Sequence, residues 1–107
     1  MKTMKDREKG FESKFVHDEA LKFKAEARRN KLLGHWAAGL MGKSGAVADE
    51  YAKEVIRADF EEAGDEDVFR KLRADLDAAE VALSDSDLRS VMREKMAVAI
   101  DQIQNEG

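Results

Sequence analysis

Cysteine is absent from this sequence of 107 residues, and so is proline. Without cysteine there are no disulfides, no thiolate metal sites and no cysteine nucleophiles, which suits a reducing cytoplasm. No apolar run approaches the ~18–20 residues of a membrane span, and the first residues lack a signal-peptide core. We therefore expect a cytoplasmic protein without direct membrane insertion. Without proline, only glycine interrupts helical patterns, so nearly the whole chain is predicted to be helical.

Charge is abundant but unevenly distributed. Residues 1–31 hold ten lysines and arginines against six aspartates and glutamates, whereas residues 32–107 hold nine against seventeen. A basic start on an acidic body suggests an acidic partner surface, nucleic acid, or docking of the start on its own body. We expect no nucleic-acid partner, because carboxylates interleave with the basic residues and the acidic body repels phosphates.

Residues 1–17 have a thin apolar line within dense mixed charge. Met4, Phe11 and Phe15 project to within about 40° of one another at ~100° per residue. Ordering about twelve residues costs roughly 1–2 kcal/mol each, whereas burying each phenylalanine returns about 1.5–3 kcal/mol. Isolated helices of this length are marginal in water. We therefore predict a mobile arm that orders only in a groove of another protein, where Arg7, Lys9 and Lys14 form charge-assisted pairs.

The rest of the chain, residues 18–107, predicts an all-α fold: a four-helix bundle joined by short polar turns. Asp18, Ser44, Asp65 and the segment 84–87 are the predicted helix starts, and the second helix is predicted to run from Gly45 to Ala63. The predicted buried stripes of the four helices are Leu21, Ala25, Leu32, Leu33, Trp36 and Leu40; Val47, Tyr51, Val55 and Ala58, with Ala48 and Ala52; Val68, Phe69, Leu72, Leu76 and Ala79; and Leu88, Val91, Met92, Met96, Ala99 and Ile103. Ile56 and Phe60 point away from the second stripe, so either both faces of that helix are packed or the two residues form a contact patch.

No motif in the sequence predicts catalysis, a cofactor or a metal. The tripeptide Gly42-Lys43-Ser44 lacks the preceding glycine of a phosphate-binding loop, because Ala37 stands there. The acidic run over residues 61–67 lacks the ligand order of a calcium loop, and neither His17 nor His35 has a zinc-ligand partner at helical spacing. We therefore expect no enzyme. The alternative is a small helical bundle that binds a nucleotide or another anion through Arg28, Arg29 and Lys43.

Several segments occur in a specific order along the chain: Asp6-Arg7-Glu8, Phe11-Glu12, Lys14-Phe15, Arg28-Arg29-Asn30-Lys31-Leu32-Leu33-Gly34, Trp36-Ala37-Ala38, Tyr51-Ala52-Lys53-Glu54-Val55, Asp59-Phe60-Glu61-Glu62-Ala63-Gly64 and Asp67-Val68-Phe69-Arg70-Lys71. Together they resemble the zeta subunit, the small inhibitor of the F-type ATP synthase of alpha-proteobacteria. The resemblance covers nearly the whole chain.

This resemblance implies a four-helix bundle with a mobile N-terminal arm that is disordered when free and helical when bound. The arm would enter the catalytic head between the alpha and beta subunits, near gamma, and block rotation in the direction of ATP hydrolysis. The protein would be a monomer when free and peripheral to the inner membrane when bound. The contact residues carried over by position are Asp6, Arg7, Glu8, Phe11, Glu12, Lys14 and Phe15.

The sequence departs from the family pattern at two arm positions. Met4 stands where relatives often have an aromatic residue, and Gly10 stands where alanine is common. Glycine inside a helix costs about 0.5–1 kcal/mol relative to alanine. If the arm becomes helical on binding, Gly10 lowers its affinity roughly two- to fivefold.

An arm that packs stably on its own bundle is the remaining alternative, and it would make the chain a plain structural domain.

Overall fold

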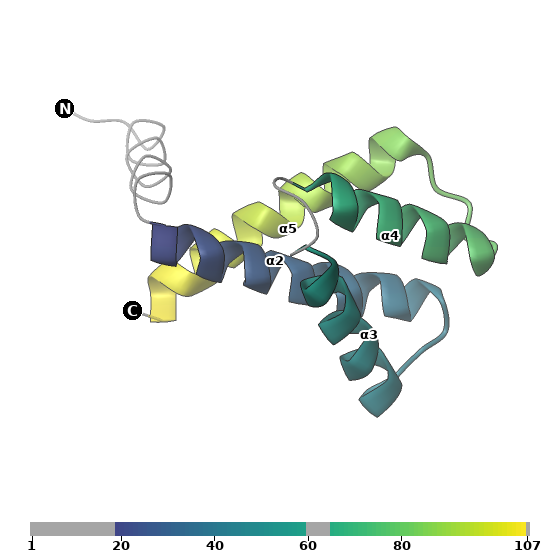
Figure 1. Ribbon diagram of the computed structural model, residues 1–107, viewed down its shortest axis with the longest axis horizontal. Helices are drawn as coiled ribbons and strands as arrows, with labels where there is room; N and C mark the ends of the chain where they lie inside the picture. The colour runs from purple at the N-terminus through teal and green to yellow at the C-terminus, as the bar shows by residue number, and fades with distance from the viewer. Residues whose placement is uncertain (1–18, 60–64, 107) are drawn as a thin grey trace.

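The computed structural model describes residues 19–59 and 65–106, and in these ranges the fold is all-α. The helices are α2 (Glu19–Leu40), α3 (Gly45–Ala58), α4 (Glu66–Ala78) and α5 (Asp85–Glu106). The long helices α2 and α5 lie side by side at the end where α2 begins and α5 finishes, and α3 and α4 pack toward the opposite end (Figure 1). The prediction of an all-α four-helix bundle is confirmed.

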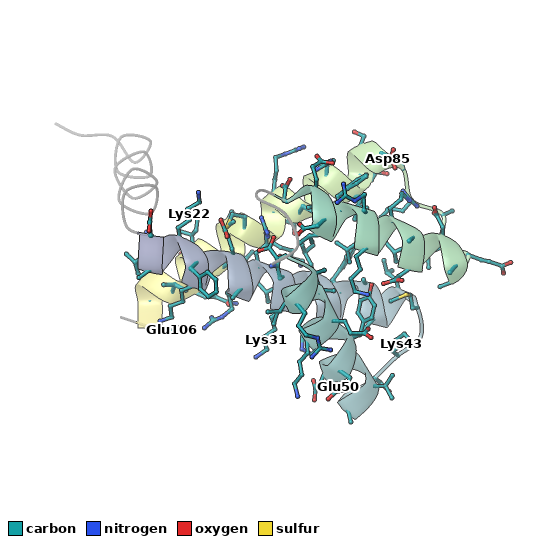
Figure 2. All side chains as sticks on the ribbon, viewed as in Figure 1. Lys22, Lys31, Lys43, Glu50, Asp85 and Glu106 are labelled. Carbon is teal, nitrogen blue, oxygen red and sulfur yellow. The ribbon has the colours of Figure 1, made fainter. Side chains whose placement is uncertain are left out.

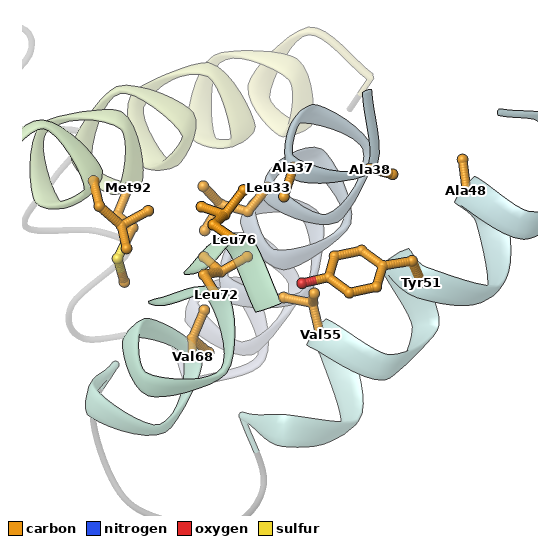
Figure 3. Packing of buried hydrophobic residues seen from close by; sticks show 11 residues of the cluster. Leu33, Ala37, Ala38, Ala48, Tyr51, Val55, Val68, Leu72, Leu76 and Met92 are labelled. Carbon is orange, nitrogen blue, oxygen red and sulfur yellow. The ribbon is translucent and has the colours of Figure 1, made fainter. Parts of the chain in front are cut away.

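Leucine and valine side chains from all four helices form the core. Leu33 of α2, Leu72 and Leu76 of α4 and Leu88 of α5 are fully buried, and Val55 of α3 packs against them. Figure 3 shows several of these side chains converging between the helices. Burying a side chain of this size contributes about 1.5–3 kcal/mol, so this cluster supplies much of the driving force for folding.

The backbones of α2 and α3 come into close contact at Gly34 of α2. A Cβ atom added at Gly34 would lie 2.4 Å from the Cα of Ala52 in α3, a distance that no real Cβ contact shows. Gly39, five residues later in α2, has nothing within 4 Å of the corresponding position. The sequence therefore needs glycine at position 34 to let α2 and α3 meet, and it has no such need at position 39.

The same hydrogen-bond pattern ends α2 and α4. At the end of α2 the N–H of Lys43 donates to the carbonyl of Ala38 (2.8 Å), and Gly42 adopts the left-handed conformation with φ +77°. At the end of α4 the N–H of Val81 donates to the carbonyl of Leu76 (2.9 Å), but the left-handed residue is Glu80 with φ +61°. Both ends are Schellman motifs, and a side chain in the left-handed position of the second one strains the backbone.

The predicted N-cap residues differ in whether their side chains form a capping hydrogen bond. The Ser84 hydroxyl accepts a hydrogen bond from the N–H of Asp87 (3.0 Å), so this N-cap is confirmed. Ser44 and Asp65 do occupy the N-cap positions of α3 and α4, but neither side chain forms a capping hydrogen bond. The Asp65 carboxylate instead accepts from Arg89 of α5 (3.3 Å). Asp18 lies outside the described residues.

Three predicted core residues are exposed: Leu40 at 45%, Val47 at 58%, and Ala79. All three lie in the first or last turn of a helix or just beyond it, where no neighbouring helix covers them. The buried face of α3 is centred on the face that bears Ala48, Tyr51, Ala52, Val55 and Ala58. The stripe of α3 was therefore predicted one residue too early at its start.

The structure ends α3 earlier than predicted, at Ala58 rather than Ala63. The next residue, Asp59, directs its carboxylate toward Arg29 of α2, which fixes the chain where it leaves α3. Ile56 is half-buried. Phe60, the acidic residues Glu61 and Glu62, and Gly64 lie outside the described residues.

Replacing Gly34 and Gly39 by alanine tests the close contact of α2 with α3. Gly34→Ala should lower the free energy of unfolding by about 1–3 kcal/mol, because the new methyl group displaces α3. Gly39→Ala is the matched control and should raise it by about 0.5–1 kcal/mol through helix propensity alone. Urea unfolding measures both, and equal stabilisation by the two variants would contradict the contact.

Replacing Glu80 by glycine tests the strain at the end of α4. Glu80→Gly removes a side chain from a left-handed position and should raise the free energy of unfolding by about 0.5–1 kcal/mol. Gly42→Ala introduces the same strain at the end of α2 and should lower stability by a similar amount. Thermal unfolding of the two variants checks the pair, and a destabilised Glu80→Gly protein would show that the Glu80 side chain is needed there.

Candidate interaction site

All eight residues of the predicted inhibitory arm lie outside the described residues. They are Asp6, Arg7, Glu8, Lys9, Phe11, Glu12, Lys14 and Phe15. The described structure begins at Glu19 with the first turn of α2, two positions after the last residue of the predicted arm. The geometry of that first turn is therefore the part of the candidate site that the structure supplies.

The first turns of α2 pack against the last turns of α5. Ala25 and Ile103 are buried there, with Leu21, Met96 and Ile100 packed around them. Arg28 reaches across to α5, donating from Nη1 to Oε1 of Gln102 (3.0 Å) and placing Nη2 2.7 Å from Oε1 of Glu106. Figure 2 shows Glu106 at this end of the molecule, beside the start of α2.

Arg29 belongs to a buried polar cluster on the other side of α2. Its Nε donates to Oδ1 of Asn30 (3.0 Å), and its Nη2 lies 3.7 Å from Oδ2 of Asp59. Burial raises the pKa of Asp59 above its ordinary value, although Asn30 and Arg29 oppose the shift. Nearby Asp67 adds to the rise. The long separation from Arg29 explains why desolvation outweighs attraction at this carboxylate.

A groove of about 410 Å³ lies between α3 and α4. At its base the Tyr51 hydroxyl donates to Oδ2 of Asp75 (2.8 Å), and Lys71 Nζ lies 3.0 Å from the same oxygen. Burial raises the pKa of Tyr51, with a further rise from Asp75, so the hydroxyl stays protonated and acts as a donor. Lys43 and Glu54 also line the groove. Its two lysines are balanced by two carboxylates, so its charge does not favour an anion.

The structure does not bring together the three residues of the predicted anion site. Arg28 and Arg29 lie in the first half of α2 and are engaged by Glu106 and Asp59. Lys43 follows the end of α2 at the far end of the bundle, as Figure 2 shows. At ~1.5 Å per residue, the helix between Arg29 and Leu40 alone is about 16 Å long.

The described residues contain no group of three histidine, cysteine, aspartate or glutamate side chains that could hold a metal ion. His35 lies on α2 with Nε2 3.7 Å from Oδ1 of Asp49 on α3; the His35 side chain is partly buried and that of Asp49 is exposed. His17 is outside the described ranges. None of the helices over residues 19–59 and 65–106 is long and apolar enough to cross a membrane.

Comparison with known proteins decides the family. The family described as ATPase inhibitor subunit zeta matches residues 1–102. The chain belongs to this family. A solved structure described as the solution NMR structure of a protein is similar to it, with 50% sequence identity and a TM-score of 0.72. That similarity covers 81% of this chain and 99% of the other. No curated protein matches.

Family membership places the protein among ATPase inhibitor subunits. The resemblance found in the sequence is thereby confirmed at the level of the family.

Two features of the described structure have no signal in the sequence pattern. The contacts of Arg28 with Gln102 and Glu106 join residues more than 70 positions apart, which helical periodicity does not pair. The ion pair of Arg29 with Asp59 is also non-local, because it joins α2 to the residue that follows α3. The sequence shows basic residues inside an otherwise apolar stripe, but this pattern does not identify their partners.

Asp59→Asn tests the balance of forces at the buried carboxylate. Because the pKa of Asp59 is raised in the folded state, that state binds the proton more tightly than the unfolded chain does. The stability of the native protein should therefore fall as pH rises from about 4 through the raised pKa, and the asparagine variant should lack this decline. Urea unfolding between pH 4 and 7 checks the difference. A variant less stable than the native protein at pH 7 would show that the Arg29–Asp59 attraction dominates instead.

Proposed function

We propose that this protein inhibits ATP hydrolysis by the F-type ATP synthase through its first 17 residues. The arm would wedge between the alpha and beta subunits of the catalytic head, near gamma, and block rotation in the hydrolytic direction. The observation that carries the proposal is the extent of the family match, which includes the arm together with the bundle. While bound, the protein would be peripheral to the inner membrane.

The arm residues divide by the chemistry that a groove would offer them. Phe11 and Phe15 would enter an apolar pocket, each contributing about 1.5–3 kcal/mol on burial. Arg7, Lys9 and Lys14 would form charge-assisted pairs with carboxylates of the synthase. The acidic members Asp6, Glu8 and Glu12 would pair with basic groups of the synthase. Together these contacts offset the free energy of ordering the arm. That cost exceeds what burial of either phenylalanine alone contributes.

The bundle contributes to inhibition without chemistry of its own. A single helix is about 10–12 Å across with its side chains, and four packed helices form a much wider body. The bundle therefore acts as a stop that keeps the arm from threading further into the head. It also holds the arm at the entrance once one contact forms, which raises its effective concentration there.

Replacing both arm phenylalanines tests the wedge directly. Phe11→Ala with Phe15→Ala should raise the half-inhibitory concentration for ATP hydrolysis by purified synthase at least tenfold, because the apolar anchors are lost. The melting temperature should stay nearly unchanged, since these rings are predicted to lie outside the bundle core.

The matched control removes two exposed apolar side chains from the far end of the bundle. Leu40→Ala with Val47→Ala should leave inhibition unchanged, because both side chains lie away from the start of α2. Full inhibition by the double phenylalanine variant would refute the wedge. A matching loss of thermal stability in that variant would place the rings in the core instead.

A further inference from the structure

The charge in the last turn of α5 does not complement the dipole of that helix. The C-terminal end of a helix carries partial negative charge and favours cations, yet the last turn of α5 has no basic residue and ends in Glu106. Two basic side chains of α2 supply positive charge at this end instead. Arg28 Nη2 lies 2.7 Å from Glu106, and Lys24 Nζ lies 4.0 Å from the other oxygen of the same carboxylate.

These contacts secure the part of α2 that follows the arm. Within the described residues, the apolar cluster that covers the first turns of α2 is built from α2 and α5 alone, with Ala25 and Ile103 at its centre. Helix ends fray unless packing or capping holds them. The end of α5 is therefore the support for the beginning of α2, as the side-by-side placement in Figure 1 also shows.

A secured first turn changes how a neighbouring segment becomes helical. Nucleating a helix in free solution is unfavourable, with a nucleation constant of about 10⁻³. Extending an existing helix avoids this nucleation step. An arm that becomes helical on binding can extend α2 only if the first turn of α2 is already intact. If that turn is frayed, binding must order the first turn of α2 as well as the arm, and this added ordering lowers the affinity.

We propose that Arg28 and Glu106 form a positioning pair for inhibition: they hold the first turns of α2 as the template from which the arm extends on the synthase. This inference rests on the proposed function of the arm. It assigns a role to residues that need not touch the synthase, and it makes the C-terminal end of the chain a determinant of inhibitory strength.

A charge reversal and its compensating swap test the pair. Glu106→Arg places two cations against each other and should raise the half-inhibitory concentration on purified synthase by ~3- to 10-fold. The double variant Arg28→Glu with Glu106→Arg re-forms the pair in reverse and should return the value to within about twofold of the native protein. Glu94→Arg is the matched control: it makes the same charge change at an exposed position of α5 and should have no effect.

Amide hydrogen exchange over residues 19–28 reports whether the first turns of α2 are intact, which a measurement of inhibition does not show. Exchange should be faster in Glu106→Arg and return to the native rate in the swapped pair, while the melting temperature changes little in either. Native inhibition by Glu106→Arg, with inhibition lost in the double phenylalanine variant, would overturn the positioning role and leave the proposed function standing. Native inhibition by both would overturn the two together. A swap that restores exchange rates but not inhibition would show that these side chains contact the synthase directly.

Discussion

The approach of α2 to α3 at Gly34 is the constraint on which the packing of the described bundle depends. No side chain separates the two backbones there, because a Cβ atom would lie 2.4 Å from the Cα of Ala52. With α3 seated this closely, Val55 reaches the core beside Leu33, where the leucines of α4 and α5 complete the cluster. A wider separation would open space that these side chains cannot fill without rearrangement.

Three polar residues of α2, Arg28, Arg29 and Asn30, help to hold the bundle together. Arg28 secures the end of α5, and Arg29 with Asn30 receives the carboxylate that follows α3. Two of the three basic side chains predicted to bind an external anion, Arg28 and Arg29, are thus engaged by acidic partners from the same chain. These two basic side chains therefore stabilise the bundle that supports the arm. The proposed inhibitory contacts belong to the arm itself.

Helical periodicity predicted the four helices and most of the core, because residues such as Leu72, Leu76 and Leu88 recur at the spacing of a buried face. The errors fall at helix ends. Leu40 and Val47 fit their stripes but are exposed, because burial there depends on where a neighbouring helix stops, which one helix's pattern does not contain. The left-handed Glu80 and the pairing of Arg28 with Glu106 depend likewise on distant parts of the fold. The arm contacts were predicted from the residue pattern and from the resemblance, and they stay a prediction.

Deleting residues 1–17 measures most directly whether inhibition resides in the arm. The remaining chain keeps every described residue, so it should retain its helical content and melting temperature. Added to purified F-type ATP synthase, it should neither slow ATP hydrolysis nor be retained on the enzyme in a pull-down. Undiminished inhibition by the shortened chain would contradict the account and move the inhibitory surface to the bundle.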